Sequence, residues 1–132
     1  MKRIVGNIGV FRLPNDKFAF GRIFKDSTVA FYKHMGNSEK DLPEKEDYAF
    51  IVGVFTEDIT KMKLIDKRPF QDEKEVTPPP SYIKDPISGK YKIYENGKIR
   101  PSTYEECKGL ERCAVWHMNH VIDRLMGDDK WN

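Results

Sequence analysis

The sequence lacks the features of a membrane protein, a disulfide-rich secreted domain or a strongly basic nucleic-acid binder. Its longest apolar run, residues 48–55, is far too short to cross a bilayer. Only two cysteines are present, Cys107 and Cys113, and one pair does not make a disulfide scaffold, so we expect reduced thiols. Charged residues make up 33% of the chain, yet the formal net charge is only +2, which gives no field that attracts nucleic acid.

The N-terminus also lacks a secretion signal. Lys2 and Arg3 precede a mildly apolar run, but Asn7 and two glycines interrupt it and no cleavage-like site follows. We therefore expect a soluble, cytoplasmic protein without a membrane partner.

Motifs for phosphate binding and for serine-type catalysis are absent as well. The chain contains no GxGxxG, no GxxxxGK[ST] and no GxSxG. The neighbouring carboxylates Glu105 and Glu106 are not a catalytic pair, because adjacent side chains on a helix point about 100° apart. These absences favour a protein that works by binding, with no catalytic residues and no cofactor.

Cys113, His117 and His120 fall at helical spacing, which in principle suits a metal site. Zinc takes four ligands in a structural site, or three plus an open position, and no second motif supplies the rest. Cys107 or Cys113 as a nucleophile would need an adjacent base, and His117 lies on the same predicted helix as Cys113. The simpler interpretation is that both histidines flank a buried stripe, with no metal bound.

The N-terminal half has the alternation of a β-meander. Residues 8–13, 17–25 and 28–33 predict three strands joined by tight turns. In the second strand Phe18, Phe20 and Phe24 share one face and small or aliphatic residues the other, as in a barrel or a sheet covered on both sides. Residues 48–55 predict a fully apolar and therefore central strand.

The segments between and after these strands are more polar. Residues 34–47 predict a loop, residues 56–62 a turn or short helix, and residues 63–70 are ambiguous. Residues 78–80 are three prolines, which predict a rigid extended connector. Further on, Asn96-Gly97 predicts a type I′ hairpin within residues 91–100, since that turn requires positive φ at both central residues.

The C-terminal segment, residues 101–126, carries the helical pattern of the chain. Ser102 or Thr103 is followed three residues later by a glutamate, which is the spacing of a capping box. Gly109 divides the pattern into a short helix over residues 104–108 and a longer one over residues 110–126. The longer helix would place one apolar face on the sheet, with Trp116 nearly opposite and covered by a second element. That face comprises Leu110, Ala114, Val121 and Leu125, flanked by His117 and Met118.

Taken together, these patterns predict an α+β fold. We expect a mostly antiparallel, strongly curved β-sheet or small barrel, closed by a C-terminal helix. The length suits a single domain over residues 1–132, strand-rich in 1–100 and helical in 101–127.

The order of residues resembles the immunity protein 26 family of bacterial polymorphic toxin and contact-dependent growth inhibition systems. The resemblance covers most of the chain, and its C-terminal motifs are the most specific. The motifs are IGVF at 8–11, KFAFGRI at 17–23, YAFIV at 48–52, PPP at 78–80, YIKDP at 82–86, YKIY at 91–94, IRP at 99–101, EECKGLE at 105–111, AVW at 114–116 and DRL at 123–125. The resemblance implies a mostly β immunity protein that binds and neutralises a cognate toxin domain, without catalysis.

Many such toxins are nucleases with basic clefts, which carboxylates can plug by imitating a phosphate backbone. The charged loops are therefore the candidate toxin-binding surface, although solvated loops carry such charges by default. The candidates are Asp41, Glu44, Glu46, Asp47, Asp72, Glu73 and Glu75.

Two other functions remain open. A small RNA-binding or RNA-processing β-domain could use a basic and aromatic face, with Tyr91, Tyr94, Lys90, Lys92 and Lys98 stacking bases and holding phosphates. The near-neutral charge disfavours direct nucleic-acid binding. The chain could also be a structural subunit of a larger assembly. The sequence leaves open the toxin, its contact surface and the oligomeric state.

Overall fold

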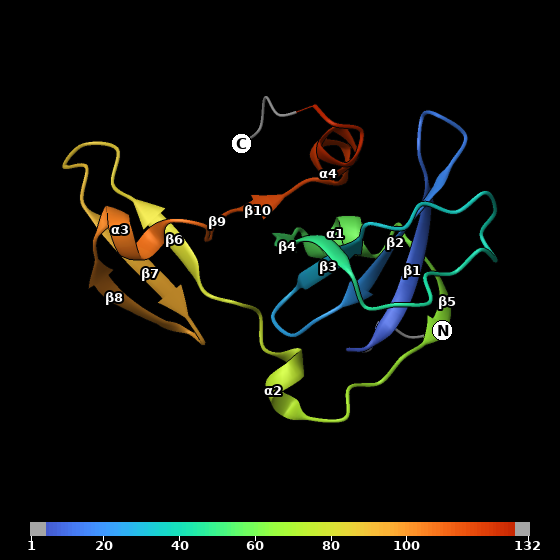
Figure 1. Ribbon diagram of the computed structural model, residues 1–132, viewed down its shortest axis with the longest axis horizontal. Helices are drawn as coiled ribbons and strands as arrows, with labels where there is room; N and C mark the ends of the chain where they lie inside the picture. The colour runs from blue at the N-terminus through green and yellow to red at the C-terminus, as the bar shows by residue number, and fades with distance from the viewer. Residues whose placement is uncertain (1–4, 129–132) are drawn as a thin grey trace.

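The computed structural model describes residues 5–128 and contains two separate β-sheets with four short helices (Figure 1). The larger sheet has six strands in the order β10-β4-β3-β2-β1-β5. These strands are β1 (Asn7–Arg12), β2 (Phe18–Ile23), β3 (Thr28–Tyr32), β4 (Tyr48–Val54), β5 (Lys63–Lys67) and β10 (Val115–Trp116).

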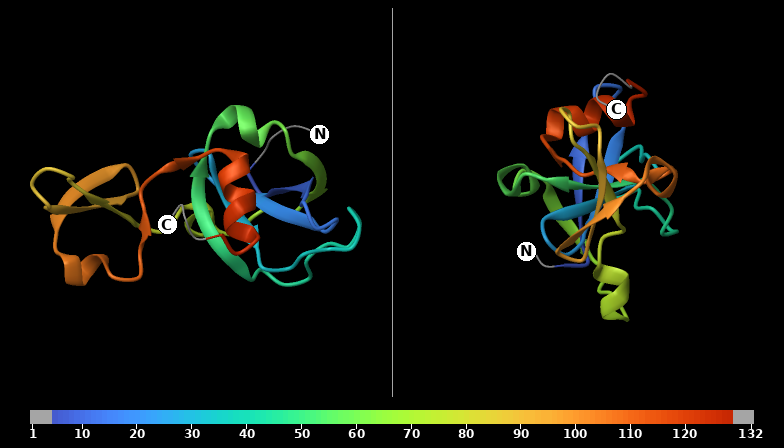
Figure 2. Two further views of the ribbon diagram at one scale, coloured as in Figure 1. Left: turned by 90° about the horizontal axis from the view of Figure 1, so that it is seen from above. Right: turned by 90° about the vertical axis from the view of Figure 1, so that its left-hand side faces the viewer.

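The smaller sheet has four strands in the order β8-β7-β6-β9. These are β6 (Ser81–Lys84), β7 (Tyr91–Glu95), β8 (Lys98–Ser102) and β9 (Glu111–Arg112). The helices are α1 (Thr56–Ile59), α2 (Glu73–Val76), α3 (Tyr104–Cys107) and α4 (Met118–Leu125). Figure 2 shows the two sheets side by side, joined by the proline segment 78–80 and by the chain between β9 and β10.

The predicted meander is confirmed in the large sheet. β1, β2, β3 and β4 pair antiparallel in chain order, and the ambiguous segment after α1 supplies β5, which pairs with β1. Gly21 leaves room for a neighbouring side chain, since a Cβ there would lie 2.7 Å from Cγ1 of Val29. The sequence thus placed β1 to β4 correctly, but the predicted central position of β4 holds only in part, because the two-residue β10 is its sole outer neighbour among residues 5–128.

Both faces of the large sheet are covered, as the apolar residues on both sides of β2 predict. One core cluster includes Phe31, Phe50 and Val121, so that α4 packs on this face. The other includes Ile8, Phe20 and Tyr32 and is covered in part by the loop between β3 and β4. The sheet is nevertheless open rather than barrel-shaped, because no pairing joins β5 to β10 among residues 5–128. The expected closure by the C-terminal helix is likewise not supported.

The long helix predicted over residues 110–126 is wrong in its first half. After Gly109, which has φ +82°, the chain forms β9 and then β10, and α4 begins only at Met118. β9 pairs in parallel with β6, and β10 in parallel with β4. These partners lie far away in sequence, so pairing with them overrides the local helical spacing. Leu110 and Ala114 therefore do not share a helical face with Val121.

Other C-terminal predictions are confirmed. The hydroxyl of Thr103 accepts a hydrogen bond from the Glu106 amide at the start of α3. Trp116 is buried as predicted, stacked on Phe50 at 6.4 Å between ring centroids. It lies in β10, however, and shares a core cluster with Val121 instead of lying opposite it on a helix. Asn96 and Gly97 have φ of +51° and +79°, as the predicted hairpin turn requires. Cys107 and Cys113 are both free thiols.

Candidate partner-binding surfaces

The loop between β3 and β4 carries four of the seven acidic candidates, and their carboxylates differ in how much they are engaged. Asp41 accepts a hydrogen bond from the Asn37 amide at 2.9 Å and lies 3.4 Å from the His34 ring, so it shapes the loop. Asp47 lies 3.4 Å from Lys33 Nζ and stays largely exposed. Glu44 is exposed, and its carboxylate has no partner among residues 5–128. Glu44 and Asp47 are therefore the acids of this loop most accessible to a partner.

Glu46 has a different environment from its neighbours. Its Oε1 accepts hydrogen bonds from the hydroxyls of Tyr32 at 2.6 Å and Tyr48 at 2.8 Å and from Arg22 at 2.9 Å. Its Oε2 accepts from Arg68 at 3.1 Å. Burial alone would raise the pKa of Glu46, but these hydrogen bonds and the two arginine charges lower it overall. The carboxylate thus joins residues of three strands and the segment after β5, and its hydrogen bonds are made within the chain.

Arg22 is the buried partner of Glu46. Its side chain is 9% exposed, and its guanidinium lies 3.7 Å from the centroid of the Phe70 ring. It also donates to the backbone oxygen of Arg68 at 2.6 Å, which fixes the segment after β5. Burial, followed by the nearby Glu46, raises the pKa of Tyr32 and of Tyr48, so both phenols stay protonated as donors. No pattern in the sequence indicated this network, because its members are dispersed between residues 22 and 70.

The second group of acidic candidates lies at α2. Asp72 caps this helix, accepting a hydrogen bond from the Lys74 amide at 3.0 Å. Glu75 is exposed, whereas the side chain of Glu73 lies outside what the structure describes. α2 follows the large sheet and precedes the proline connector, and Figure 1 places it well apart from the loop between β3 and β4. The two acidic groups therefore do not form one continuous patch.

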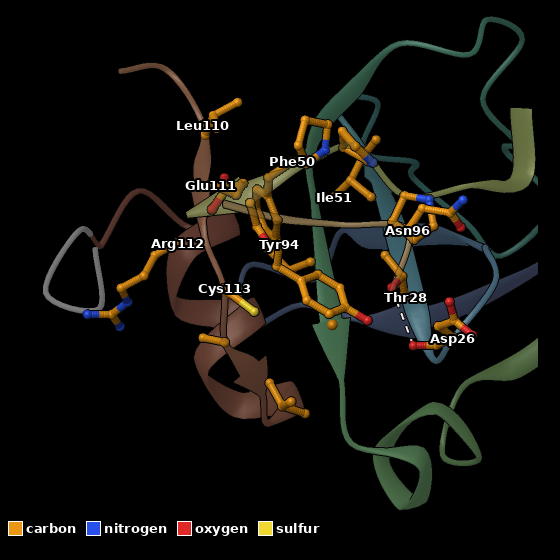
Figure 3. A pocket seen from close by; sticks show the side chains of 18 of the residues that line it. Asp26, Thr28, Phe50, Ile51, Tyr94, Asn96, Leu110, Glu111, Arg112 and Cys113 are labelled. Atoms are coloured by element: carbon orange, nitrogen blue, oxygen red, sulfur yellow. Dashed lines mark hydrogen bonds between the residues drawn. The ribbon is translucent and has the colours of Figure 1, made fainter. Parts of the chain in front are cut away.

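A cleft between the two sheets was not predicted. It has a volume of about 560 Å³, and most of its lining is apolar (Figure 3). In this view Glu111, Arg112 and Cys113 lie on one side, and Ile51, Thr28 and Asp26 on the other. Tyr94 and the proline segment 78–80 also line the cleft. Sequence reasoning could not find this cleft, because it depends on the division into two sheets and on the path from β9 to β10.

Cys113, His117 and His120 do not share the helix on which their spacing would place them. Cys113 lies between β9 and β10 rather than on the helix, and residues 5–128 contain no group of three or more His, Cys, Asp or Glu side chains that could hold a metal. His117 instead pairs with Asp58 of α1, with 2.9 Å between Nδ1 and Oδ2, and stacks on Phe55.

Asp58 anchors the C-terminal helix to the rest of the chain. Its buried carboxylate also accepts from the Met118 amide at 3.2 Å and lies 3.1 Å from Lys61 Nζ. The hydrogen bond from His117 is the largest of the contributions that lower the pKa of Asp58. The carboxylate thus caps α4, whose own N-cap residue makes no side-chain cap bond.

The proposed basic and aromatic face divides between two sides of the small sheet. Along β7, residues alternate between faces, so Tyr91 and Tyr94 point in opposite directions. Tyr91 packs near Tyr82 and Tyr104, whereas Tyr94 lines the cleft. The two tyrosines therefore cannot stack bases on one surface.

No helix in the described residues is long and apolar enough to span a membrane.

Comparison with known proteins gives one match. The family model for immunity protein 26 matches residues 4–93, which span the large sheet up to β5, the connector, β6 and the first half of β7. The motifs noted after residue 93 lie outside this match. No curated protein and no solved structure matches the chain. Since the match covers more than half of the 132 residues, the chain belongs to the immunity protein 26 family.

Proposed function

We propose that this chain is a cytoplasmic immunity protein that binds a cognate toxin domain of a bacterial polymorphic toxin or contact-dependent inhibition system and neutralises it by occlusion. The observation that carries the proposal is the family match over residues 4–93. The motif absences in the sequence agree with a protein that acts by binding. The proposed partner is a protein, without a cofactor and without catalysis by this chain.

The proposal treats residues 1–132 as one immunity-type domain. β10 and α4 follow the matched region in sequence, yet β10 pairs with β4 and Val121 of α4 is fully buried in the core of the large sheet. This contribution to a shared core supports the proposal that the C-terminal segment folds together with the matched region.

A nuclease is the toxin class that the acidic loops would suit. Exposed carboxylates meet a basic nucleic-acid cleft with favourable charge and speed the encounter. Glu44, Asp47 and Glu75 are the exposed members with the fewest internal contacts. We propose that they guide the encounter with the toxin, whereas Asp41, Glu46 and Asp72 serve mainly to hold the chain's own loops.

Co-expression in bacteria tests the function. The C-terminal region of the protein encoded immediately upstream is expressed under tight control, with and without this chain, and growth is recorded. We expect the region to stop growth and this chain to restore it through a stable complex with a dissociation constant in the nanomolar range. Killing that this chain does not relieve would overturn the proposal. Salt-dependent binding to single-stranded RNA instead would favour the RNA-binding alternative.

A further inference from the structure

The outer edge of β4 is only partly paired. The Phe24 amide donates to the Thr28 carbonyl, so the backbone groups of Thr28 point toward β2. Because this direction alternates along a strand, the N–H and C=O groups of Val29 and Phe31 point toward β4. Their partners on β4 are Val52 and Phe50.

Because backbone direction alternates along a strand, the N–H and C=O of Ile51 point away from β3. Two further hydrogen bonds agree with this direction: the Val54 amide donates toward the Ser27 carbonyl, and the Phe55 amide toward the Trp116 carbonyl on the opposite side.

β10 covers this outer edge from Gly53 to Phe55. Within the described residues, no other strand pairs with β4 on that side, so the backbone of Ile51 lies at an open edge. Ile51 also lines the cleft between the sheets. An unpaired amide and carbonyl therefore lie at the wall of a mostly apolar cleft.

The opposite wall of the cleft is another sheet edge. β9 is the outermost strand of the small sheet, and the chain passes from β9 to β10 through Cys113 and Ala114. Both β4 and β9 line the cleft, so it lies in the angle between two sheet edges. The neighbouring prolines 78–80 have no amide hydrogens and therefore cannot donate hydrogen bonds to the edge.

We propose that this cleft binds an extended segment of the toxin, which adds to β4 as a strand beside Ile51 and in line with β10. The proposal rests on the immunity function and names the surface through which it acts. An open strand edge accepts an extended backbone through main-chain hydrogen bonds, while side-chain pockets supply specificity. A helix satisfies its own backbone groups and would leave those of Ile51 unpaired.

The lining indicates which side chains the segment presents. Tyr94 and Ile51 offer apolar contact, and Glu111 is neutralised by its ion pair with Arg124. Asp26 and Arg112 are exposed, and their side chains have no ion-pair partner among residues 5–128. An apolar strand with a charged residue near each end fits this distribution.

Two variants test the proposal from the two sides of the cleft. Ile51→Pro removes the amide hydrogen at the open edge, a place where proline is tolerated because no hydrogen bond within the chain is lost. Tyr94→Ala removes apolar contact from the small sheet. Tyr91→Ala is the matched control, since it removes the same side chain from the opposite face of the same strand.

The measurement is the dissociation constant for the purified toxin domain from the co-expression experiment, with folding of each variant checked by circular dichroism. We expect Ile51→Pro and Tyr94→Ala each to weaken binding at least about tenfold, and Tyr91→Ala to change it by less than about threefold. If Ile51→Pro does not fold, the comparison of the dissociation constants of Tyr94→Ala and Tyr91→Ala decides whether the toxin binds in the cleft.

The outcomes separate the two proposals. If the wild-type chain neutralises the toxin and the cleft variants bind as tightly as wild type, the cleft assignment is wrong and the immunity function stands. If the wild-type chain does not bind the toxin, both proposals fail. If the chain alone is a dimer that Ile51→Pro converts to a monomer, the edge pairs with a second copy of the chain, which also overturns the assignment.

Discussion

The two sheets of this chain differ in how much they bury. The large sheet has apolar clusters on both faces, with Phe31 and Phe20 fully buried. Among the strands of the small sheet only Ile93 is buried, and Cys107 of the neighbouring α3 is buried as well. Because burial of apolar area drives folding, the large sheet supplies most of the stability, and the small sheet depends on the segments that join it to the large one. The small sheet is thus suited to form one wall of a binding cleft.

The largest expected effect is in the core of the large sheet. Phe31 packs between Phe11 and Phe50, at 6.0 and 5.4 Å between ring centroids. Phe31→Ala should lower the free energy of unfolding by about 3–5 kcal/mol, because it leaves a cavity. Urea denaturation measures the change, and Phe31→Leu is a control that keeps most of the volume. If Tyr91→Ala in the small sheet lowers the free energy of unfolding as much, the conclusion that the large sheet supplies most of the stability is wrong.

The next effect is at the ion pair of Arg22 with Glu46, in which Arg22 is buried and Glu46 is partly exposed. Removing one partner of a fully buried pair costs about 3–5 kcal/mol, but the Glu46 side chain is 39% exposed, so Arg22→Met should cost about 2–3 kcal/mol. Glu46→Gln removes the charge and keeps an acceptor for Tyr32 and Tyr48, so it should cost less. Thermal and urea unfolding compare the two variants. Equal stability of Arg22→Met and wild type would show that the network does not hold the loops.

A smaller effect is expected where α4 joins α1. Asp58→Asn weakens the contacts with His117 and Lys61 and should cost about 1–2 kcal/mol at neutral pH. The pKa of Asp58 is lowered from 3.8, so the folded chain binds fewer protons at this site than the unfolded chain does. The stabilisation is therefore complete above about pH 3.8 and is lost as the pH falls through the lower folded value.

Unfolding measured from pH 7 to pH 2 checks this dependence. The stability difference between wild type and Asp58→Asn should shrink on acidification. A difference that stays constant across this range would mean that the charge of Asp58 does not contribute.

The smallest effect is expected in the small sheet. Thr103→Ala removes the cap of α3 and should cost about 1 kcal/mol, whereas Thr103→Ser keeps the hydroxyl and should cost less. Amide hydrogen exchange should show faster opening of α3 with little change in the large sheet. Exchange that accelerates equally in β3 would mean that the two sheets open as one unit.

These regions also differ in how far the sequence predicted them. The meander, the turn at Asn96 and Gly97 and the cap at Thr103 were predictable because each depends on neighbours in the chain. The strands of residues 111–116 were not, because β9 and β10 exist only through pairing with β6 and β4. The acidic candidates were predicted from charge alone. Charge does not distinguish Glu46, which is bonded to two tyrosines and two arginines, from Glu44, whose carboxylate has no partner among residues 5–128. The cleft could not be predicted from the sequence, because it exists only where the two sheets lie next to each other.

The exchange rate of the Ile51 amide tests the central claim most directly. In the free chain we expect this amide to exchange rapidly, between the slowly exchanging amides of Phe50 and Val52, which bond to β3. With the toxin bound, Ile51 should become as protected as its neighbours, because its amide then donates to the added strand. An Ile51 amide that is already protected in the free chain, or one whose exchange is unchanged in a complex that neutralises the toxin, would contradict the account.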